Sequence, residues 1–339
     1  MIQSFSIHRV GNKSADEPMR LSKQEVKLND ELQNILSQYF LSSFKSEEYY
    51  RFYHTIELSL NGVYTCISKV FENPRSLHEQ SVNLAKHLYD KSTHPKIKGG
   101  EFYVAYFKDC HLNGETMDAV GLFKSENKDT YIEVEPVTDG FDIESRQGIN
   151  INKLDKGCLI FNTEKENGFI LSIVDNTNKA TEAQYWKDDF LSVLVLNNDF
   201  TQTNQFLGIT KQFVTSQIDE DFEMSKADKI DLLNRSVDYF KKHDRFDKEE
   251  FEQEVFFHPN VIESFQKFDQ HYRRENAVEP ADSFEISAQA VKQQARAFKS
   301  VLKLDKNFHI YIHGNRELIE QGIDENGRKY YKIYYEHEA

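Results

Sequence analysis

Apolar and polar positions follow two different periods along this chain, and the period changes near residues 98–100 and again after Asn176. Between residues 101 and 173 the period is two, as in β-strands, whose side chains point alternately to opposite faces. Asn-Gly, Asp-Gly and similar turn sequences separate the short apolar runs there, which predicts an antiparallel meander of roughly six strands. On either side, apolar residues recur every three or four positions, as in amphipathic helices. The pattern therefore predicts an α+β fold.

One strand and three helices are predicted before the meander. Residues 4–10 alternate and predict the strand. Asn29 is the expected N-cap of the first helix, and Ser76 with Glu79 has the spacing of a capping box after Pro74. The three helices are expected over residues 30–44, over about residues 60–71, and from Ser76 to about Leu88. The meander is thus flanked by helices in an N-terminal α/β domain, residues 1–176.

After Asn176 the helical period persists to about Leu304 and predicts a second, mainly helical domain, residues 177–339. Strands are expected over residues 307–313 and, after a turn at Gly327, over residues 330–335. The domain would end in a basic helix and a short β-hairpin. The predicted helices cover residues 182–194, 200–218, 226–242, 248–256, 260–272 and 287–302, with caps at Ser225, Asp247 and Ser287.

The charge of the chain is negative overall but unevenly distributed. The 339 residues carry a net charge of −14, which disfavours non-specific binding to nucleic acid or to anionic membranes. Residues 219–279 contain 17 acidic and 10 basic side chains, whereas residues 287–316 contain six basic side chains and one acidic, Asp305. Any nucleic-acid site must therefore be local, and neighbouring segments of opposite charge indicate either intramolecular pairing or two functional faces.

The basic segment has the spacing of a helical stripe. Its first four cations are separated by four, three and four residues, and the opposite helix face carries apolar side chains. Such a stripe fits a phosphate backbone, although a solvated helix that pairs with the acidic segment would show the same pattern. Because no base-reading module accompanies it, contacts would be largely independent of sequence. The candidate DNA-binding residues are Lys292, Arg296, Lys299, Lys303, Lys306 and Arg316.

Two motifs suggest metal chemistry but lack what a metal site requires. His309 and His313 flank Tyr311 on the predicted polar side of a strand, and no third ligand is evident, so a solvent-facing surface or an auxiliary phosphate contact is favoured. Asp118 followed by Glu126 and Lys128 matches the D…ExK pattern of metal-dependent nucleases. Glu126 and Lys128 nevertheless lie in a turn-like sequence, which argues against a rigid site. We therefore expect no metal, no cofactor and no enzyme activity.

The cysteines and the apolar runs indicate a cytosolic protein. Cys66, Cys110 and Cys158 are dispersed and form no CxxC motif, as in proteins of reducing compartments. The N-terminal sequence is not that of a signal peptide. No apolar run approaches the roughly 20 residues that a membrane span needs, so we expect no membrane contact.

Long segments of the chain resemble one bacterial family. They include IKGGEFYVAYFKDC, AVGLFKSENKDTYIEV, GININKLDKGCLIFNTEKENGFILSIVDN, EAQYWKDDFL, DLLNRSVDYFKK and QQARAFKSVLKLDKNFHIYIHGNRELIE. They look like the 37-kDa nucleoid-associated protein family, and the similarity covers nearly the whole chain. It implies a location at the nucleoid in the cytoplasm, with DNA binding as the working function and no catalytic motif. A homodimer is expected by analogy.

A second hypothesis makes the protein an adaptor. The acidic segment 219–279 would recruit a basic protein partner, and contact with DNA would then be indirect.

Overall fold

The computed structural model divides into two compact units, unit 1 over Met1–Leu196 and unit 2 over Asn197–Ala339. The mixed α+β composition predicted from the sequence is confirmed. None of the helices in the described ranges is long and apolar enough to span a bilayer. The structure describes residues 1–112, 114–177, 185–276, 278, 280–295, 298, 301–312 and 316–337.

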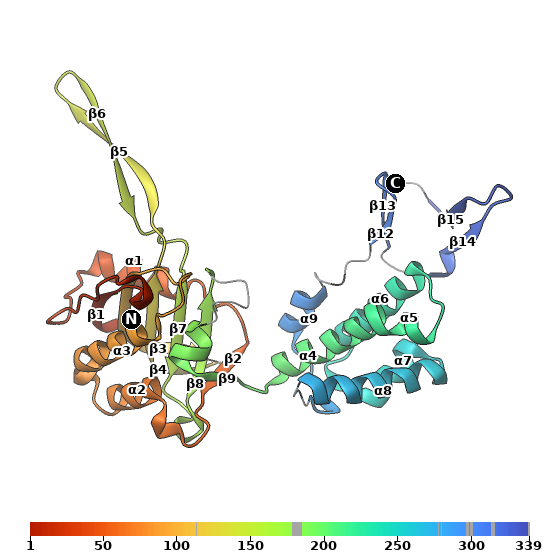
Figure 1. The fold of residues 1–339 in the computed structure, drawn as a ribbon, viewed down its shortest axis with the longest axis horizontal. Helices are drawn as coiled ribbons and strands as arrows, with labels where there is room; N and C mark the ends of the chain where they lie inside the picture. The colour runs from red at the N-terminus through yellow and green to blue at the C-terminus, as the bar shows by residue number, and fades with distance from the viewer. Residues whose placement is uncertain are drawn as a thin grey trace. The chain divides into compact units, whose positions relative to one another are not determined.

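Unit 1 is built on a seven-stranded antiparallel sheet with the strand order β1-β3-β4-β7-β8-β2-β9 (Figure 1). The sequence placed the domain boundary at residues 176–177; the sheet continues past it, because β9 pairs with β2 at the edge. The strands are β1 (Ile2–Val10), β2 (Tyr49–Phe52), β3 (Gly100–Leu112), β4 (Glu115–Ser125), β7 (Lys156–Phe161), β8 (Ile170–Asp175) and β9 (Val193–Val195).

Helices cover both faces of this sheet. In β3, Phe102 and Val104 belong to the core cluster that also contains side chains of α2 and α3. Tyr103 and Ala105 belong instead to the cluster that contains side chains of α1. Burial on both faces explains why this strand reads as a continuous apolar run rather than an alternating one. The helices are α1 (Asp30–Leu41), α2 (Gly62–Glu72) and α3 (Leu77–Lys91), with a short π-helix at Lys187–Leu191 where residues 182–194 were expected to be α-helical.

The caps predicted for unit 1 are confirmed in part. The side chain of Asn29 accepts a hydrogen bond from the Leu32 N–H, so it caps α1 as expected. Ser76 precedes α3 but makes no side-chain capping bond, because it lies at the end of a 3₁₀ turn with helical backbone angles. The capping box predicted for Ser76 and Glu79 was therefore wrong.

The six strands predicted between residues 101 and 173 all form, but they do not make one meander. Strand β4 pairs with β7, and the two strands between them leave the sheet and pair only with each other (Figure 1). These are β5 (Asp129–Val137) and β6 (Gly140–Gly148). Turn signals predict strand ends, but they do not tell which strands pair.

A buried histidine links β1 to α3. His8 is 3% exposed; its Nε2 lies 2.8 Å from Ser81 Oγ, and its Nδ1 accepts the Ser22 N–H at 3.1 Å. This pattern fits a neutral ring with the proton on Nε2. Burial, together with the neighbouring His78, lowers the pKa of His8 from 6.5 to about 4.

We therefore expect unit 1 to lose stability as the pH falls below 6.5. The unfolded chain binds a proton at His8 there, whereas the folded chain does not until about pH 4. Unfolding is thereby favoured by about 2 kcal/mol at pH 5 relative to pH 7. Urea titrations followed by the fluorescence of Trp186, the single tryptophan, would measure this. His8→Gln should remove the effect and His111→Gln, at an exposed site, should keep it; an unchanged pH dependence in His8→Gln would contradict the expectation.

Unit 2 is mainly helical around a phenylalanine-rich core that includes Phe206, Phe240, Phe251 and Phe265. The predicted caps at Ser225 and Asp247 are confirmed, and Ser225 forms a capping box with Asp228. The elements are α4 (Asp199–Gln212), a π-helix (Phe213–Gln217), α5 (Ile218–Asp221), α6 (Lys226–Lys242), β10 (Arg245–Asp247), α7 (Lys248–Phe256), α8 (Pro259–Asn276), β11 (Ser283–Glu285), α9 (Ala288–Ala295), β12 (Val301–Leu304), β13 (Phe308–Tyr311), β14 (Ile319–Ile323) and β15 (Lys329–Ile333).

Candidate nucleic-acid interface

The basic segment of the sequence begins on α9. Ser287 precedes this helix, and its Oγ accepts the N–H of Ala290 at 3.3 Å. Ala290 and Val291 are buried, whereas Lys292 is exposed. Of the apolar side chains predicted to face inward, Val291 and Phe298 are buried and Ala295 is partly buried, whereas Ala288 is exposed; Lys292 lies outside, as predicted. Two of the candidate cations, Arg296 and Lys299, lie outside the described residues.

The predicted helix over residues 287–302 was wrong at its end, because Val301 and Leu302 lie in β12. Helix α9 is described to Ala295, and residues 296, 297, 299 and 300 lie outside the described part of the chain. Strand β12 pairs with β13 around a turn in which Asp305 has a φ of +51°, a left-handed conformation that Asp tolerates. Lys303 therefore lies on a strand and does not continue a helical stripe from Lys292. The period of two places Leu302 in an apolar cluster with α6 and leaves Lys303 exposed.

Lysines of α6, α9 and the β12–β13 hairpin meet around two adjoining hollows. Lys241 lines both, which have volumes of about 490 and 530 Å³. Lys303 and His309 pair directly across the hairpin and line the first hollow, and Lys292 lines the second. Lys306 lies in the hairpin turn. We call the group of Lys241, Lys292, Lys303, Lys306 and His309 the basic surface.

Three of the lysines of the basic surface form no ion pair with a described residue, although Asp238 lines the first hollow and Asp244 lines the second. Within the described part of the chain, Lys292, Lys303 and Lys306 have no carboxylate within 4.0 Å. Lys241 pairs with Asp238 at 3.3 Å, but both side chains are about half exposed, and such pairs contribute little. Sequence reasoning missed Lys241 because it lies in the acidic segment; the Lys-Lys pair at the end of α6 was the available signal.

Arg316 is engaged within unit 2. Its Nε lies 2.6 Å from an oxygen of Asp228, the partner of Ser225 in the capping box of α6, and its guanidinium also donates to the carbonyl of Ile319. Burial raises the pKa of Asp228, but hydrogen bonds from Ser225 and Arg316 outweigh this, so the pKa lies below its usual value. Arg316 thus anchors the start of β14 to α6, and it is the one predicted cation in the described ranges that forms an ion pair with the acidic segment.

Several acidic side chains of residues 219–279 are also used inside unit 2. Asp269 is fully buried and lies 2.6 Å from Lys248 and 2.7 Å from Arg273. Asp219 pairs with Lys229. These contacts reduce the negative charge that the segment offers to a partner.

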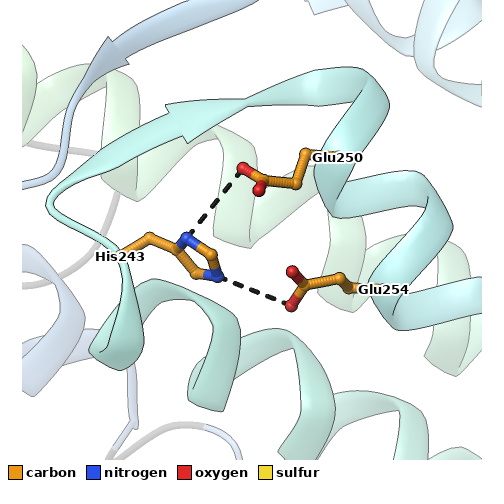
Figure 2. Close-up of side chains that lie close together, drawn as sticks. All are labelled: His243, Glu250 and Glu254. Atoms are coloured by element: carbon orange, nitrogen blue, oxygen red, sulfur yellow. Dashed lines mark ion pairs between the residues drawn. The ribbon is translucent and has the colours of Figure 1, made fainter.

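One group of described residues has the ligand types of a metal site. His243, at the end of α6, lies between Glu250 and Glu254, which are one turn apart on α7 (Figure 2). The ring of His243 stacks on Tyr239, whose hydroxyl donates to Glu250 at 3.0 Å. The carboxylates face different ring nitrogens, at 3.9 Å from Nδ1 and 3.5 Å from Nε2. The two carboxylates therefore face opposite nitrogens of the ring and do not converge on one of them. Of the predicted histidine pair, His313 lies outside the described residues.

The fold does not bring the three residues of the nuclease-like pattern, Asp118, Glu126 and Lys128, together. Asp118 lies on β4 and Glu126 directly follows it, and eight residues of extended chain span roughly 26 Å. Asp118 accepts a hydrogen bond from the Tyr106 hydroxyl, and Glu126 is buried against Lys124. Lys128 pairs with Glu101 at 2.9 Å. Glu126 and Lys128 lie between β4 and β5, outside both strands, as their turn-like sequence predicted.

Comparison with known proteins gives one family. The family model described as NA37, nucleoid-associated protein YejK, matches residues 6–329 of the chain. No curated protein matches this chain.

Proposed function

We propose that this chain, which belongs to the nucleoid-associated protein YejK family because that family's model spans residues 6–329, binds DNA directly through its basic surface. Membership of the family implies a location at the nucleoid, in the cytoplasm. The family is generally non-enzymatic, and the proposed role requires no catalytic group.

The proposal rests on one observation, the convergence of exposed lysines from α6, α9 and the β12–β13 hairpin around adjoining hollows. A lysine ammonium is a flexible point charge that suits phosphate oxygens but does not read bases. Contacts would therefore be made to the DNA backbone with weak base specificity. Tyr311, which is 65% exposed on the face that carries Lys303 and His309, adds an aromatic surface beside the cations.

A site of this size must act against a net charge of −14. Four or five phosphate contacts give modest affinity at physiological salt. A homodimer would present two basic surfaces to one duplex, and the second contact would then form at a high effective concentration.

We expect the affinity for a short random-sequence DNA duplex to fall steeply with salt. Fluorescence anisotropy of a labelled duplex, between 50 and 200 mM salt, should give a log Kd against log salt slope of about 4, because each phosphate contact releases about 0.9 of a counterion. A second duplex of unrelated sequence should give the same curve.

Two results would contradict direct phosphate contact. A slope near zero would mean that the duplex is held by other forces. Absence of binding at the lowest salt would mean that the chain reaches the nucleoid through a protein partner. The acidic segment 219–279 would then be the surface to study. A pull-down that recovers the same proteins with and without nuclease treatment would identify that route.

A further inference from the structure

The ribbon formed by β5 and β6 has one apolar and one acidic face. It pairs only with itself, from Asp129 opposite Gly148 to Val137 opposite Gly140 (Figure 1). Side chains directly opposite each other in an antiparallel pair lie on the same face. The register therefore places Ile132, Val134, Pro136, Phe141, Ile143 and Ser145 on one face, and Glu133, Glu135, Asp142, Glu144 and Arg146 on the other.

The apolar face is open to solvent. Phe141 is 73% exposed, Ile132 is 68% exposed and Ile143 is 67% exposed. Soluble monomers rarely expose a contiguous apolar patch of this kind unless it serves an interaction. A two-stranded ribbon is at best marginally stable by itself in water, so this element needs a cover on its apolar face.

The acidic face further destabilises the isolated β5–β6 ribbon. Glu133 lies opposite Glu144, and Glu135 lies opposite Asp142. Like charges directly opposite each other destabilise a strand pair. Arg146 approaches Glu133 at 2.8 Å and Glu144 at 3.2 Å, which offsets the first pair only. The ribbon carries six acidic side chains and one basic, so it would repel a phosphate backbone and is not a DNA-binding arm.

We propose that the apolar face of the β5–β6 ribbon packs against the same face of a second copy of this chain, forming a homodimer. The face carries no charged side chain, so it is complementary to itself, as a two-fold symmetric interface requires. Packing two ribbons in this way leaves both acidic faces in solvent. A different protein could bind this face only if it presented an uncharged apolar surface of similar length.

The area available suits a dimer. Five apolar side chains from each copy bury on the order of 1,000 Å² in total, which is near the lower limit for a specific protein interface. We therefore expect a reversible dimer with a micromolar dissociation constant rather than an obligate one.

Sedimentation equilibrium of the full chain tests the interface. The wild-type chain should approach twice 39.8 kDa at tens of micromolar and dissociate on dilution. Replacing Ile132, Val134 and Ile143 by Thr keeps β-propensity but removes the apolar strip; the dissociation constant should rise at least about 100-fold. The matched control replaces Glu133, Glu135 and Glu144 by Thr on the other face and should leave dimerisation intact or strengthen it. A monomeric wild-type chain, or equal effects of the two triples, would overturn the proposal.

Cross-linking gives a second measurement that does not depend on how the triple variant folds. Val134→Cys places a thiol on the apolar face, and Glu135→Cys places one on the acidic face. Under copper-catalysed air oxidation, Val134→Cys should form a covalent dimer much faster than Glu135→Cys or the wild-type chain. Of the chain's own thiols, Cys110 and Cys158 are buried and Cys66 is partly exposed, so the wild-type chain measures the background that all three contribute. Equal rates for the two variants would exclude the symmetric packing.

Discussion

Replacing Lys241, Lys292 and Lys303 by Glu is expected to weaken binding of duplex DNA by about 1,000-fold at 100 mM salt. Each substitution removes a phosphate contact and introduces a repelling charge, at roughly tenfold per site. The log Kd against log salt slope should fall by about 3. The three side chains are exposed, and their only ion pair in the described part of the chain is the surface contact of Lys241 with Asp238, so folding should be unaffected.

The matched control replaces Lys69, Lys86 and Lys91 by Glu. These lysines are exposed on α2 and α3 of unit 1, and the substitutions change the net charge by the same amount. These lysines are not part of the basic surface and make none of the proposed phosphate contacts, so the affinity should stay within about threefold of wild type. If both triples weaken binding equally, overall charge and not the basic surface governs the contact, and the proposed site is excluded.

Replacing Glu126 by Ala is expected to destabilise unit 1 by about 3–5 kcal/mol, because it leaves a buried ammonium without its counter-charge. Lys124 has no solvent exposure, and its Nζ lies 3.0 Å from Glu126 and 2.9 Å from the Tyr185 hydroxyl. Tyr185 in turn donates to Glu126 at 2.7 Å. Burial lowers the pKa of Lys124 and raises that of Tyr185, so neither group is easily charged without the network. Urea unfolding followed by Trp186 fluorescence would measure the loss.

Two further variants distinguish the effect of burial on stability from the effect of losing an ion pair in general. Glu72→Ala removes the partner of Lys165 in an exposed pair whose two atoms lie 2.7 Å apart, and should destabilise unit 1 far less than Glu126→Ala, because exposed ion pairs contribute little. The double variant Lys124→Met with Glu126→Leu removes both buried charges and should be less destabilising than Glu126→Ala alone. A loss in Glu126→Ala no larger than in Glu72→Ala would show that the buried pair contributes no more than a surface one.

The substitutions at Glu126 also test the role of the nuclease-like motif. Glu126 and Lys128 were candidates for metal chemistry because of their spacing, which the sequence shows without showing burial. In the fold, Glu126 neutralises Lys124, and the N–H groups of Glu126 and Asn127 donate to Asp155 at 2.7 and 2.8 Å. The motif is thus part of the structural connection that holds the base of the β5–β6 ribbon.

The sequence by itself determined most of the helices and the six strands between residues 101 and 173, because side-chain periodicity and caps are local properties. The short strands β2, β9, β10, β11 and β14 were not predicted. The six strands between residues 101 and 173 and the helices of unit 2 up to Asn276 follow from a period of two or of about 3.6, with capping by Asn29, Ser225 and Asp247. The uneven distribution of charge, with a basic segment at residues 287–316, is likewise visible in the sequence alone.

Only the tertiary structure decided which strands pair and which charges remain available. The separation of β5 and β6 from the sheet depends on β4 pairing with β7, a contact between distant segments. Val301 and Leu302 lie in a strand rather than in the predicted helix, because β12 pairs with β13 and Leu302 packs in an apolar cluster with α6. Arg316 forms an ion pair with Asp228. Lys241 lines the same hollow as Lys303, although the two lysines are about 60 residues apart in the sequence. Such contacts depend on long-range packing, which no local spacing in the chain encodes.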